Sequence, residues 1–410
     1  MTGDAGILQL MEDLGNALTV NQDLLMLGGG NPGQVPEVED VIRKRLLEIA
    51  EASESLHSFV GIYDPPQGNL ELIRTLADYF HNRCGWDIRP ENICLTNGSQ
   101  SAFFMLFNLL AGPMPDGSVK QIQFPLTPEY IGYTDTGIHP GLFTSSKPLI
   151  EELESNLFKY HVDFENFKVA DSAAALCVSR PTNPTGNVLT DDEIHTLDEM
   201  ARSRHIPLII DNAYGLPFPS LIYREAELFW NENTILCMSL SKLGLPSVRT
   251  GIVIGPPEIT KALASMNAIM ALAPGGIGAR LAGDLIRSGE IDRLSNNSIR
   301  PFYQKKAEAA VDFLSRAMQG VPFHIHKPEG SMFLWLWLPG VPIDSERLYQ
   351  RLKQKGVLVV SGHYFFPGLD SDWPHKHECI RISYSQDDET VHKGLEMIAE
   401  EVMAVCRGVR

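Results

Sequence analysis

A short apolar run that ends in a lysine constrains the fold of this chain most. Residues 234–238 read Thr-Ile-Leu-Cys-Met and lie between polar neighbours, a pattern that is typical of a short buried strand. Ser239-Leu240-Ser241-Lys242 follows directly. Because open α/β sheets bind ligands at the carboxyl ends of their strands, we expect Lys242 to present its amine to a cleft.

A second apolar strand is expected at 206–210, and it ends in Asp211-Asn212-Ala213-Tyr214. Arg249 lies seven positions after Lys242. A lysine that forms an imine with an aldehyde, a carboxylate that keeps a pyridine nitrogen protonated and an arginine that binds a phosphate dianion are what pyridoxal 5'-phosphate requires. Tyr214 can donate to the phenolic oxygen of the same ring. The predicted catalytic residues are Lys242, Asp211 and Tyr214, and Ser239, Ser241 and Arg249 are predicted to bind the cofactor with them.

The start of a predicted helix offers a second phosphate-binding element. Asn97-Gly98-Ser99-Gln100 ends a strand expected at 93–96 and precedes an apolar helix expected at 102–110. Free N–H groups and the positive end of the helix dipole favour a phosphate there. The alternative is ordinary N-capping by Ser99, which is compatible with phosphate binding. We therefore predict that Gly98, Ser99 and Gln100 lie at the phosphate.

Three motifs occur in an order that chance does not readily produce, at 183–186 (Asn-Pro-Thr-Gly), 211–214 (Asp-Asn-Ala-Tyr) and 239–242 (Ser-Leu-Ser-Lys). Through them the chain resembles the aspartate-aminotransferase-like superfamily, the fold type I pyridoxal phosphate enzymes, over nearly its whole length. Four further segments, at 27–32, 95–104, 179–187 and 327–330, resemble one branch of it more closely. That resemblance implies exchange of an amino group between L-valine and pyruvate, which gives 2-oxoisovalerate and L-alanine by a ping-pong reaction through Lys242.

The resemblance also implies roles for residues that spacing alone does not single out. Tyr130 is expected to stack on the cofactor ring, and Asn183 to contact its phenolic oxygen and the substrate. The N–H of Gly30 and the guanidinium of Arg381 are expected to bind the substrate carboxylate. Tyr63 is expected to reach the phosphate of a neighbouring subunit, so the resemblance implies a homodimer with composite active sites.

The strand expected at 378–385 indicates on which face of the sheet the side chain of Arg381 lies. Ile380, Ile382 and Tyr384 alternate onto one face, which leaves Arg381 on the other face among small residues. We expect it to face outward with room for a small anion, because arginine forms two parallel hydrogen bonds to a carboxylate. Without the resemblance, a surface ion pair would be the alternative.

The expectation of an apolar substrate depends on one segment that lacks charged residues. Aminotransferases that accept aspartate or glutamate need a second cation for the side-chain carboxylate, because an unpaired buried carboxylate is costly. The segment where relatives carry that arginine is approximately 262–279, and it contains no charged residue. An apolar pocket is therefore expected, into which leucine or 2-aminobutyrate could also enter, since one methylene discriminates by only about 1–3 kcal/mol.

The composition supports an enzyme of this size. At 410 residues the chain exceeds what one core usually organises, and its formal charge of −17 argues against nucleic acid or an anionic membrane as partner. The six cysteines show no metal or disulfide spacing, so they are expected to be reduced core residues of a cytoplasmic protein. The histidines at 363, 375 and 377 lack a fourth ligand at zinc-like spacing, so no metal is expected. No window of eighteen apolar residues suggests a membrane span.

The expected fold is α/β, a fold type I pyridoxal-phosphate-dependent transferase with two domains. A mostly parallel sheet at 46–300 is predicted to carry the cofactor. The smaller α+β domain is predicted to combine 1–45, an N-terminal arm and part of that domain, with 301–410. The arm, 1–26, is predicted to contain a helix near 7–18.

Two alternatives remain open at this point. Another fold type I enzyme, either an aminotransferase of different specificity or a β-lyase or decarboxylase, would use the same cofactor residues and break a different bond. A non-catalytic cofactor-binding regulator is the second alternative. Such regulators usually carry a DNA-binding module ahead of the domain, which about 26 residues before the glycine-rich segment are too short to form.

Overall fold

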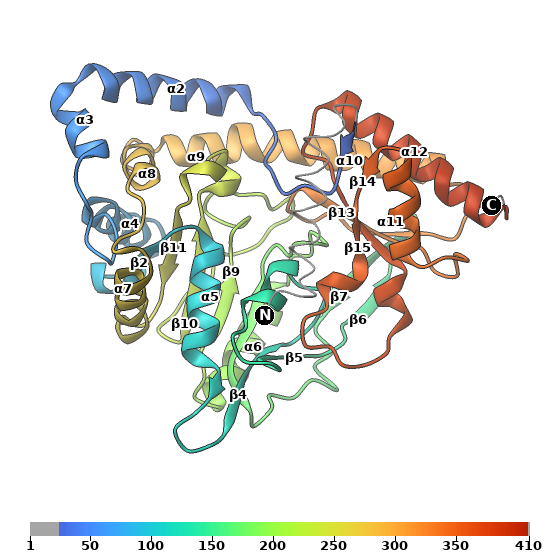
Figure 1. Ribbon diagram of the computed structural model, residues 1–410, viewed down its shortest axis with the longest axis horizontal. Coiled ribbons are helices and arrows are strands. Elements are labelled where there is room, and N and C mark those ends of the chain that lie inside the picture. Colours follow the sequence, from blue (N-terminus) through green and yellow to red (C-terminus); the bar gives the residue numbers. More distant parts are fainter. Residues whose placement is uncertain (1–23, 409–410) are drawn as a thin grey trace.

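The computed structural model describes residues 24–408, so the helix predicted near 7–18 lies outside the described residues. Two sheets and the helices around them make up the fold, with the large sheet on one side of the molecule and the C-terminal sheet on the other (Figure 1). None of the helices within 24–408 combines the length and the apolar character needed to cross a membrane.

The large sheet has eight strands, and its central strands run parallel. Strand β11 is antiparallel to both of its neighbours. In spatial order the strands are β2 (Ile93–Thr96), β11 (Gly251–Ile254), β10 (Thr234–Ser239), β9 (Leu208–Asp211), β8 (Ala173–Ser179), β4 (Val119–Phe124) and β3 (Gly112–Pro113), and β5 (Phe143–Ser145) pairs with β4.

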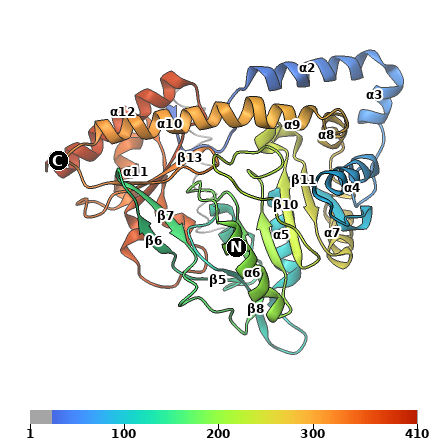
Figure 2. The same ribbon diagram turned by 180° about the vertical axis from the view of Figure 1, so that it is seen from behind.

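Helices cover both faces of this sheet, which explains why its strands are apolar runs rather than alternating ones. Helix α5 (Ser99–Leu110) packs on one face and α6 (Asp191–Ser203) on the other, as the two opposite views show (Figures 1 and 2). Ile209 of β9 belongs to the core under α5, whereas Leu208 and Ile210 belong to the core under α6. The remaining helices beside the sheet are α4 (Leu70–Cys84), α7 (Pro257–Ala271) and α8 (Ile277–Arg287).

Local sequence signals set the ends of these helices. The side chain of Asn69 accepts a hydrogen bond from the N–H of Leu72 at the start of α4, and Gly85 ends that helix in the left-handed conformation. Helix α6 begins with a capping box in which Thr190 and Glu193 satisfy each other's backbone N–H groups. These caps fix the helices against the strands that carry the site.

The C-terminal sheet has six strands and is covered by α10 (Arg300–Ala317), α11 (Ser345–Gln354) and α12 (Asp388–Cys406). In spatial order its strands are β15 (Val360–Ser361), β16 (Cys379–Ser383), β13 (Phe333–Trp337), β12 (His324–His326), β7 (Leu157–His161) and β6 (Leu149–Glu152). Strands β6 and β7 come from the middle of the chain, and Leu157 pairs with Ile325. The domain boundary predicted at 300/301 stays a prediction.

A long helical stretch joins the two halves. It consists of α9 (Glu290–Leu294), a π-helical turn (Ser295–Ile299) and α10, and it runs beside α2 (Pro36–Glu51) along one edge of the molecule (Figures 1 and 2). Helix α3 (Ser53–Val60) follows α2. Short 3-10 helices occupy Pro90–Asn92, Ile131–Thr136, Ser241–Leu243, Pro246–Val248, Gly362–Phe365 and Pro374–His377.

The glycine-rich segment 28–33 reaches the large sheet from the C-terminal half. Strand β1 (Leu25–Met26) pairs with β14 (Val357–Leu358), and Leu27 is fully buried behind it. A Cβ atom on Gly28 would lie 2.9 Å from the carbonyl oxygen of Val359, so the backbones approach too closely for a side chain. This tight packing aims residues 28–31 at the carboxyl ends of the large sheet's strands.

Candidate active site

One cavity of ≈ 210 Å³ collects nearly all of the predicted site residues at the carboxyl ends of the large sheet's strands. Side chains that follow β4, β8, β9 and β10 line it, and residues from the segment 28–33 and from β16 close it from the other side. The predicted residues in its wall are Gly30, Ser99, Gln100, Tyr130, Asn183, Asp211, Tyr214, Ser239, Ser241, Lys242, Arg249 and Arg381.

The start of α5 and a guanidinium form one end of this cavity. Gly98 is the N-cap, with φ 84°, and no side chain caps the first turn, so the alternative of capping by Ser99 is wrong. Arg249 donates from Nη1 to Ser241 Oγ at 3.2 Å and to the carbonyl oxygen of Pro246 at 3.1 Å. Unpaired backbone N–H groups, hydroxyls and a fixed guanidinium are the donors that a phosphate dianion requires.

A carboxyl group marks the floor of the cavity at the end of β9. Asp211 accepts from the hydroxyl of Tyr133 at 2.6 Å and from the N–H of Ala213 at 2.9 Å. Burial raises the pKa of Asp211, while these two hydrogen bonds and the charge of Lys242 oppose the rise. The two donors hold the carboxyl plane in one orientation.

The amine of Lys242 lies in the middle of the cavity wall. Its Nζ donates to the carbonyl oxygen of Gly30 at 2.6 Å and lies 5.4 Å from the ring centroid of Tyr214. Burial and the positive charges of Arg381 and Arg249 lower the pKa of Lys242 to about 8. A substantial fraction of this amine is therefore neutral near physiological pH, as a nucleophile or base must be.

Arg381 closes the cavity opposite the lysine. It donates from Nη1 to Asn183 Oδ1 at 2.8 Å and from Nη2 to the carbonyl oxygen of Gly28 at 2.6 Å. Its guanidinium carbon lies 4.2 Å from the ring centroid of Phe333 and 5.2 Å from that of Phe365. Burial lowers the pKa of Arg381 to about 10.

The prediction that Arg381 faces outward is wrong, because the side chain is only 2% exposed. The segment 28–31 and the two phenyl rings cover the face of the sheet that alternation assigned to solvent. The alternative, a surface ion pair, is also wrong, since no carboxylate within 24–408 pairs with Arg381 and its Nε has no hydrogen-bond partner there. A buried, stacked guanidinium with free donor capacity suits a carboxylate ligand.

Several residues at this site were missed by the sequence analysis. Tyr133 bonds Asp211 directly, and Glu129 and Ser179 lie behind it. Phe103 of α5 lines the cavity as well. Tyr133 follows Tyr130 by three positions, on the same side of a helical turn, and this spacing is the signal that could have identified it.

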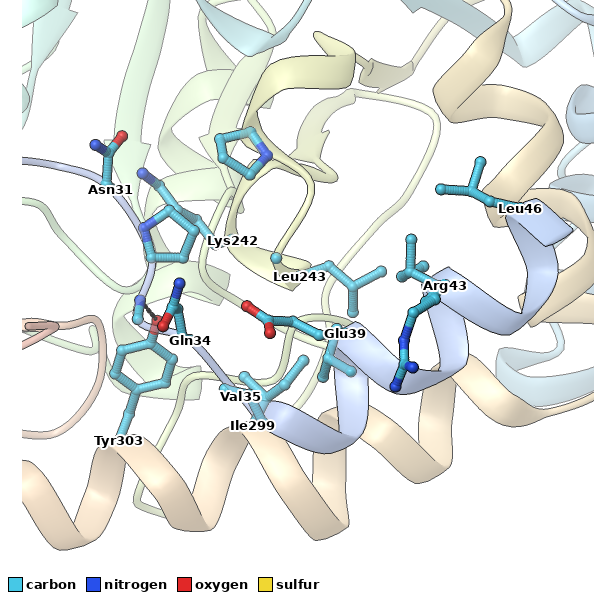
Figure 3. A pocket seen from close by; sticks show the side chains of 16 residues that line it. Asn31, Gln34, Val35, Glu39, Arg43, Leu46, Lys242, Leu243, Ile299 and Tyr303 are labelled. Carbon is cyan, nitrogen blue, oxygen red and sulfur yellow. Dashed lines mark hydrogen bonds between the residues drawn. The ribbon is translucent and has the colours of Figure 1, made fainter. Parts of the chain in front are cut away.

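A second cavity of ≈ 340 Å³ adjoins the first at Lys242, between α2 and α10. Figure 3 shows the lysine amine directed toward Asn31 at one end, with Val35, Leu243 and Ile299 along the wall. Glu39 also lines this cavity, and Arg43 at its rim is paired with Asp40. We call this space the side chamber.

Tyr63 lies apart from both cavities, on the loop between α3 and α4. Its side chain is 82% exposed, and the neighbouring Ile62 is exposed as well. Ile269 and Leu272 at the end of α7 are further exposed apolar side chains. Asp64, the next residue after Tyr63, forms a bidentate ion pair with Arg280, with N–O distances of 2.8 and 3.1 Å.

No cluster of three or more histidine, cysteine, aspartate or glutamate residues arranged to hold a metal ion occurs within 24–408. The six cysteines, all in that range, are free, and four of them are buried. The prediction of unpaired core cysteines therefore holds for these four, and it is wrong for Cys406, which is exposed, and for Cys84, which is only partly buried.

The parallel sheet, with a lysine, a carboxylate and an arginine at its strand ends, defines a fold type I transferase, as predicted. The chain belongs to the class I and II aminotransferase family, whose model matches residues 26–398. The enzyme class is thereby confirmed. The family depends on pyridoxal phosphate in general and acts on amino acids and 2-oxo acids.

Three aminotransferases are similar to this chain over nearly its whole length. The valine–pyruvate aminotransferase of Escherichia coli K12 is 50% identical over 98% of this chain and 96% of its own length. A putative amino-acid aminotransferase from Psychrobacter arcticum 273-4 superposes with a TM-score of 0.97 at 46% identity, covering 99% of this chain and 97% of that one. The valine-pyruvate aminotransferase of Salmonella typhimurium LT2 superposes with a TM-score of 0.91 at 48% identity, covering 98% and 100%.

Proposed function

We propose that this aminotransferase exchanges an amino group between L-valine and pyruvate, giving 2-oxoisovalerate and L-alanine, with bound pyridoxal 5'-phosphate. The observation that carries this proposal is the placement of Lys242 between a cation-lined cavity and a side chamber with apolar walls. The relative that is 50% identical is named for the same pair of substrates.

The donor set fits the cofactor. Ser99, Ser241, Arg249 and the free N–H groups of α5 would hold the phosphate, because they offer hydroxyls, a positive charge and a helix dipole together. A Cβ on Gly98 would lie 2.1 Å from Arg249 Nη2, so the absence of a side chain at Gly98 allows the guanidinium to rest against the helix start. When bound, the cofactor supplies an electron sink for the pair left at the substrate Cα.

The protein's own residues would orient the cofactor ring and move protons at the substrate. Asp211 would keep the ring nitrogen protonated, and Tyr130 would lie against the ring face. Asn183 and Tyr214 would donate to the phenolic oxygen. With its pKa lowered to about 8, the neutral amine of Lys242 would take the proton from the substrate Cα and return it to the carbon atom two bonds away, on the other side of the amino nitrogen. Because one product leaves before the second substrate binds, the reaction is ping-pong.

Arg381 and Gly30 would fix the substrate. The two Nη atoms of Arg381 now donate to Asn183 and to the carbonyl of Gly28, so its fork is already held in the plane that a carboxylate would share. The N–H of Gly30 would add a third donor beside Lys242. A substrate carboxylate held this way sets its Cα within reach of the lysine amine.

Charge in the side chamber favours an apolar substrate side chain. Val35, Leu243 and Ile299 line it, and the carboxylate of Glu39 would repel an acidic substrate. Arg280, the first cation after the uncharged segment 262–279, is already paired with Asp64. Apart from Lys242 itself, the described residues of the side chamber and of the segment 262–280 therefore contain no cation without a carboxylate partner.

A homodimer is part of the proposal. Exposed Tyr63 and the exposed apolar residues Ile62, Ile269 and Leu272 suit contact with a second subunit, where the hydroxyl of Tyr63 would reach the other phosphate.

The assay that tests the function uses valine with and without pyruvate. Without pyruvate, the proposal predicts at most one equivalent of 2-oxoisovalerate per enzyme site. With pyruvate in excess it predicts continuous turnover, with one alanine formed for each 2-oxoisovalerate. A β-lyase or decarboxylase would instead release ammonia or carbon dioxide without any acceptor. Acceptor-independent turnover of valine would reject the proposed reaction.

A further inference from the structure

A carboxyl group that the proposed mechanism does not use lies buried behind Asp211. Glu129 follows β4 and is only 1% exposed. Its backbone N–H donates to the carbonyl oxygen of Phe365 at 2.8 Å. Among the residues that the structure describes, no arginine, lysine or histidine forms an ion pair with this carboxyl. A buried carboxyl without a cation requires an explanation, because an unpaired buried charge is costly.

A chain of hydrogen bonds connects Glu129 to Asp211. The Ser179 N–H donates to Glu129 Oε1 at 2.8 Å, and the hydroxyl of Ser179 is hydrogen-bonded to Glu129 Oε2. The same hydroxyl lies 3.3 Å from the hydroxyl of Tyr133, which donates to Asp211 Oδ2 at 2.6 Å. The carboxyls of Glu129 and Asp211 are thus joined through two hydroxyl groups. Asp211, at the end of this chain, is the carboxyl proposed to pair with the nitrogen of the cofactor ring.

Counting hydrogens shows that this chain is fully hydrogen-bonded only when one of the two carboxyls carries a proton. If both carboxyls were ionised, Ser179 would donate to Glu129 and Tyr133 to Asp211, and no hydrogen would remain between the two hydroxyls. If Glu129 is neutral, it donates to Ser179, Ser179 donates to Tyr133, and Tyr133 donates to Asp211. Every hydroxyl then donates once and accepts once, and three donors point toward one anion. The mirror arrangement, with the proton on Asp211 and all three bonds reversed, is equally complete, so the choice between the two carboxyls depends on their surroundings.

The surroundings of the two carboxyls favour the proton on Glu129, because Glu129 is fully buried without a cation, whereas Asp211 lines the cavity near the positive charge of Lys242. Burial and the negative charge of Asp211 raise the pKa of Glu129 to about 8, against the hydrogen bonds from Ser179 and from the Tyr130 backbone. Lys242 is the cation among the titratable side chains that face this pair, and its positive charge favours the ionised form of Asp211. Burial raises the pKa of the others above the usual range, so they are neutral: Tyr130, Tyr133, Tyr214, Cys177 and Cys237. The negative charge of the group therefore resides at Asp211.

We propose that Glu129 is a positioning residue that, as a neutral acid, heads a donor chain through Ser179 and Tyr133 and thereby keeps Asp211 ionised and correctly oriented. This inference rests on the proposed function, because the charge at Asp211 matters only if that carboxyl pairs with a protonated ring nitrogen. It assigns a role to three residues, Glu129, Ser179 and Tyr133, that contact the cofactor through Asp211.

The first test needs no cofactor. Unfolding of the apoprotein is measured between pH 5 and 8 for the wild type and for Glu129→Gln, which preserves one donor and one acceptor but binds no proton in this range. A carboxyl neutral in the fold and ionised in the unfolded chain makes the wild type less stable as pH rises, by up to tenfold in the unfolding equilibrium constant per pH unit relative to E129Q. The proposal is wrong if the difference in unfolding free energy between the two proteins stays constant from pH 5 to 8, or if the wild type gains stability relative to E129Q as pH rises.

The second test asks whether Glu129 acts through the chain. Cofactor affinity of the apoprotein is compared for E129Q, Glu129→Leu and Tyr133→Phe. Glutamine can donate to Ser179 as the neutral acid does, so E129Q is expected to bind the cofactor at least tenfold more tightly than E129L. In the double variant E129L/Y133F, affinity should be no lower than in Y133F alone, because the chain is already cut.

Two results would contradict the inference in this second test. An equal loss of cofactor affinity in E129Q and E129L would mean that Glu129 acts as an anion. Additive losses in the double variant would mean that Glu129 supports packing independently of Tyr133. If E129L does not fold, the comparison of E129Q and Y133F with the wild type and the pH test still decide the question. Failure of the proposed function would appear differently, as wild-type protein that neither binds the cofactor nor transfers an amino group.

Discussion

Arg381 of β16 donates to Asn183 Oδ1 over 2.8 Å, which joins the C-terminal sheet to the turn that follows β8 of the large sheet. Because the carbonyl oxygen of Asn183 is occupied, its amide N–H₂ is left to face the cavity. One hydrogen bond thus orients two residues with different proposed partners, the substrate carboxylate for Arg381 and the phenolic oxygen for Asn183.

Arg381→Lys is predicted to raise KM for both amino acids and 2-oxo acids. Lysine preserves the charge but loses the planar fork, and one charge-assisted hydrogen bond is worth about 1.5–3 kcal/mol, or roughly 10–100-fold. Steady-state kinetics with valine and with pyruvate measure the effect. Cofactor affinity serves as the control and should not change, because Arg381 is assigned to the substrate; unchanged KM values would remove Arg381 from that role.

Gly98→Ala is predicted to weaken cofactor binding through Arg249. A Cβ at this position would lie 2.1 Å from Arg249 Nη2, so the guanidinium must move. The matched control is Gly85→Ala, which also places alanine at a positive φ but has no atom within 4 Å of the new Cβ. Both substitutions should destabilise the fold by about 1–3 kcal/mol, and only G98A should lower cofactor affinity in a titration of the apoprotein. Equal cofactor affinity in the two variants would show that Arg249 does not contribute to binding of the phosphate.

The reactivity of Lys242 should depend on pH with an inflection near 8. Burial, Arg381 and Arg249 lower the pKa of Lys242 to about 8, and the neutral amine is the reactive form, so its acylation rate should rise with pH and level off above that value. Trace labelling of the apoprotein with acetic anhydride, followed by peptide mass spectrometry, gives the profile. Arg249→Gln removes one positive charge and should move the inflection upward. An inflection near the ~10.4 of free lysine would show that the site does not tune this amine.

Tyr63→Phe should lower cofactor affinity without affecting folding. The side chain is 82% exposed in one subunit, so loss of its hydroxyl costs no buried contact there. In a dimer, the same change removes one hydrogen bond to the charged phosphate of the other subunit, worth about 1.5–3 kcal/mol, or roughly 10–100-fold in affinity. Sedimentation of the wild type tests the assembly itself, and a fully active monomer would refute the composite site.

The strands of the large sheet could be predicted from sequence with little error. The expected strand at 93–96 coincides with β2, the expected strand at 234–238 differs from β10 by one residue, and the expected strand at 206–210 begins two residues before β9 begins and ends one residue before β9 ends. Buried strands with both faces covered are short apolar runs between polar residues, so they are visible locally. For the same reason Lys242 and Asp211, each at the end of such a run, could be placed in the cavity.

Features that depend on distant contacts could not be predicted in this way. The burial of Arg381 depends on the segment that begins at Gly28, 353 positions away, and alternation within one strand cannot reveal it. The pairing of β7 with β12 likewise joins residues far apart in the chain. Glu129 has no local signal, because its significance arises only when Ser179 and Tyr133 are brought between it and Asp211.

The most direct test of the central claim is the half-reaction with single amino acids. Pure protein loaded with pyridoxal 5'-phosphate is mixed with one amino acid and no acceptor, and the visible absorbance of the bound cofactor is followed as the amino group is transferred to it. Lys242→Ala serves as the control and should show no conversion. The account predicts rapid conversion by valine and alanine and slow conversion by aspartate and glutamate, because the side chamber has apolar walls and contains Glu39. Rapid conversion by aspartate or glutamate would contradict it.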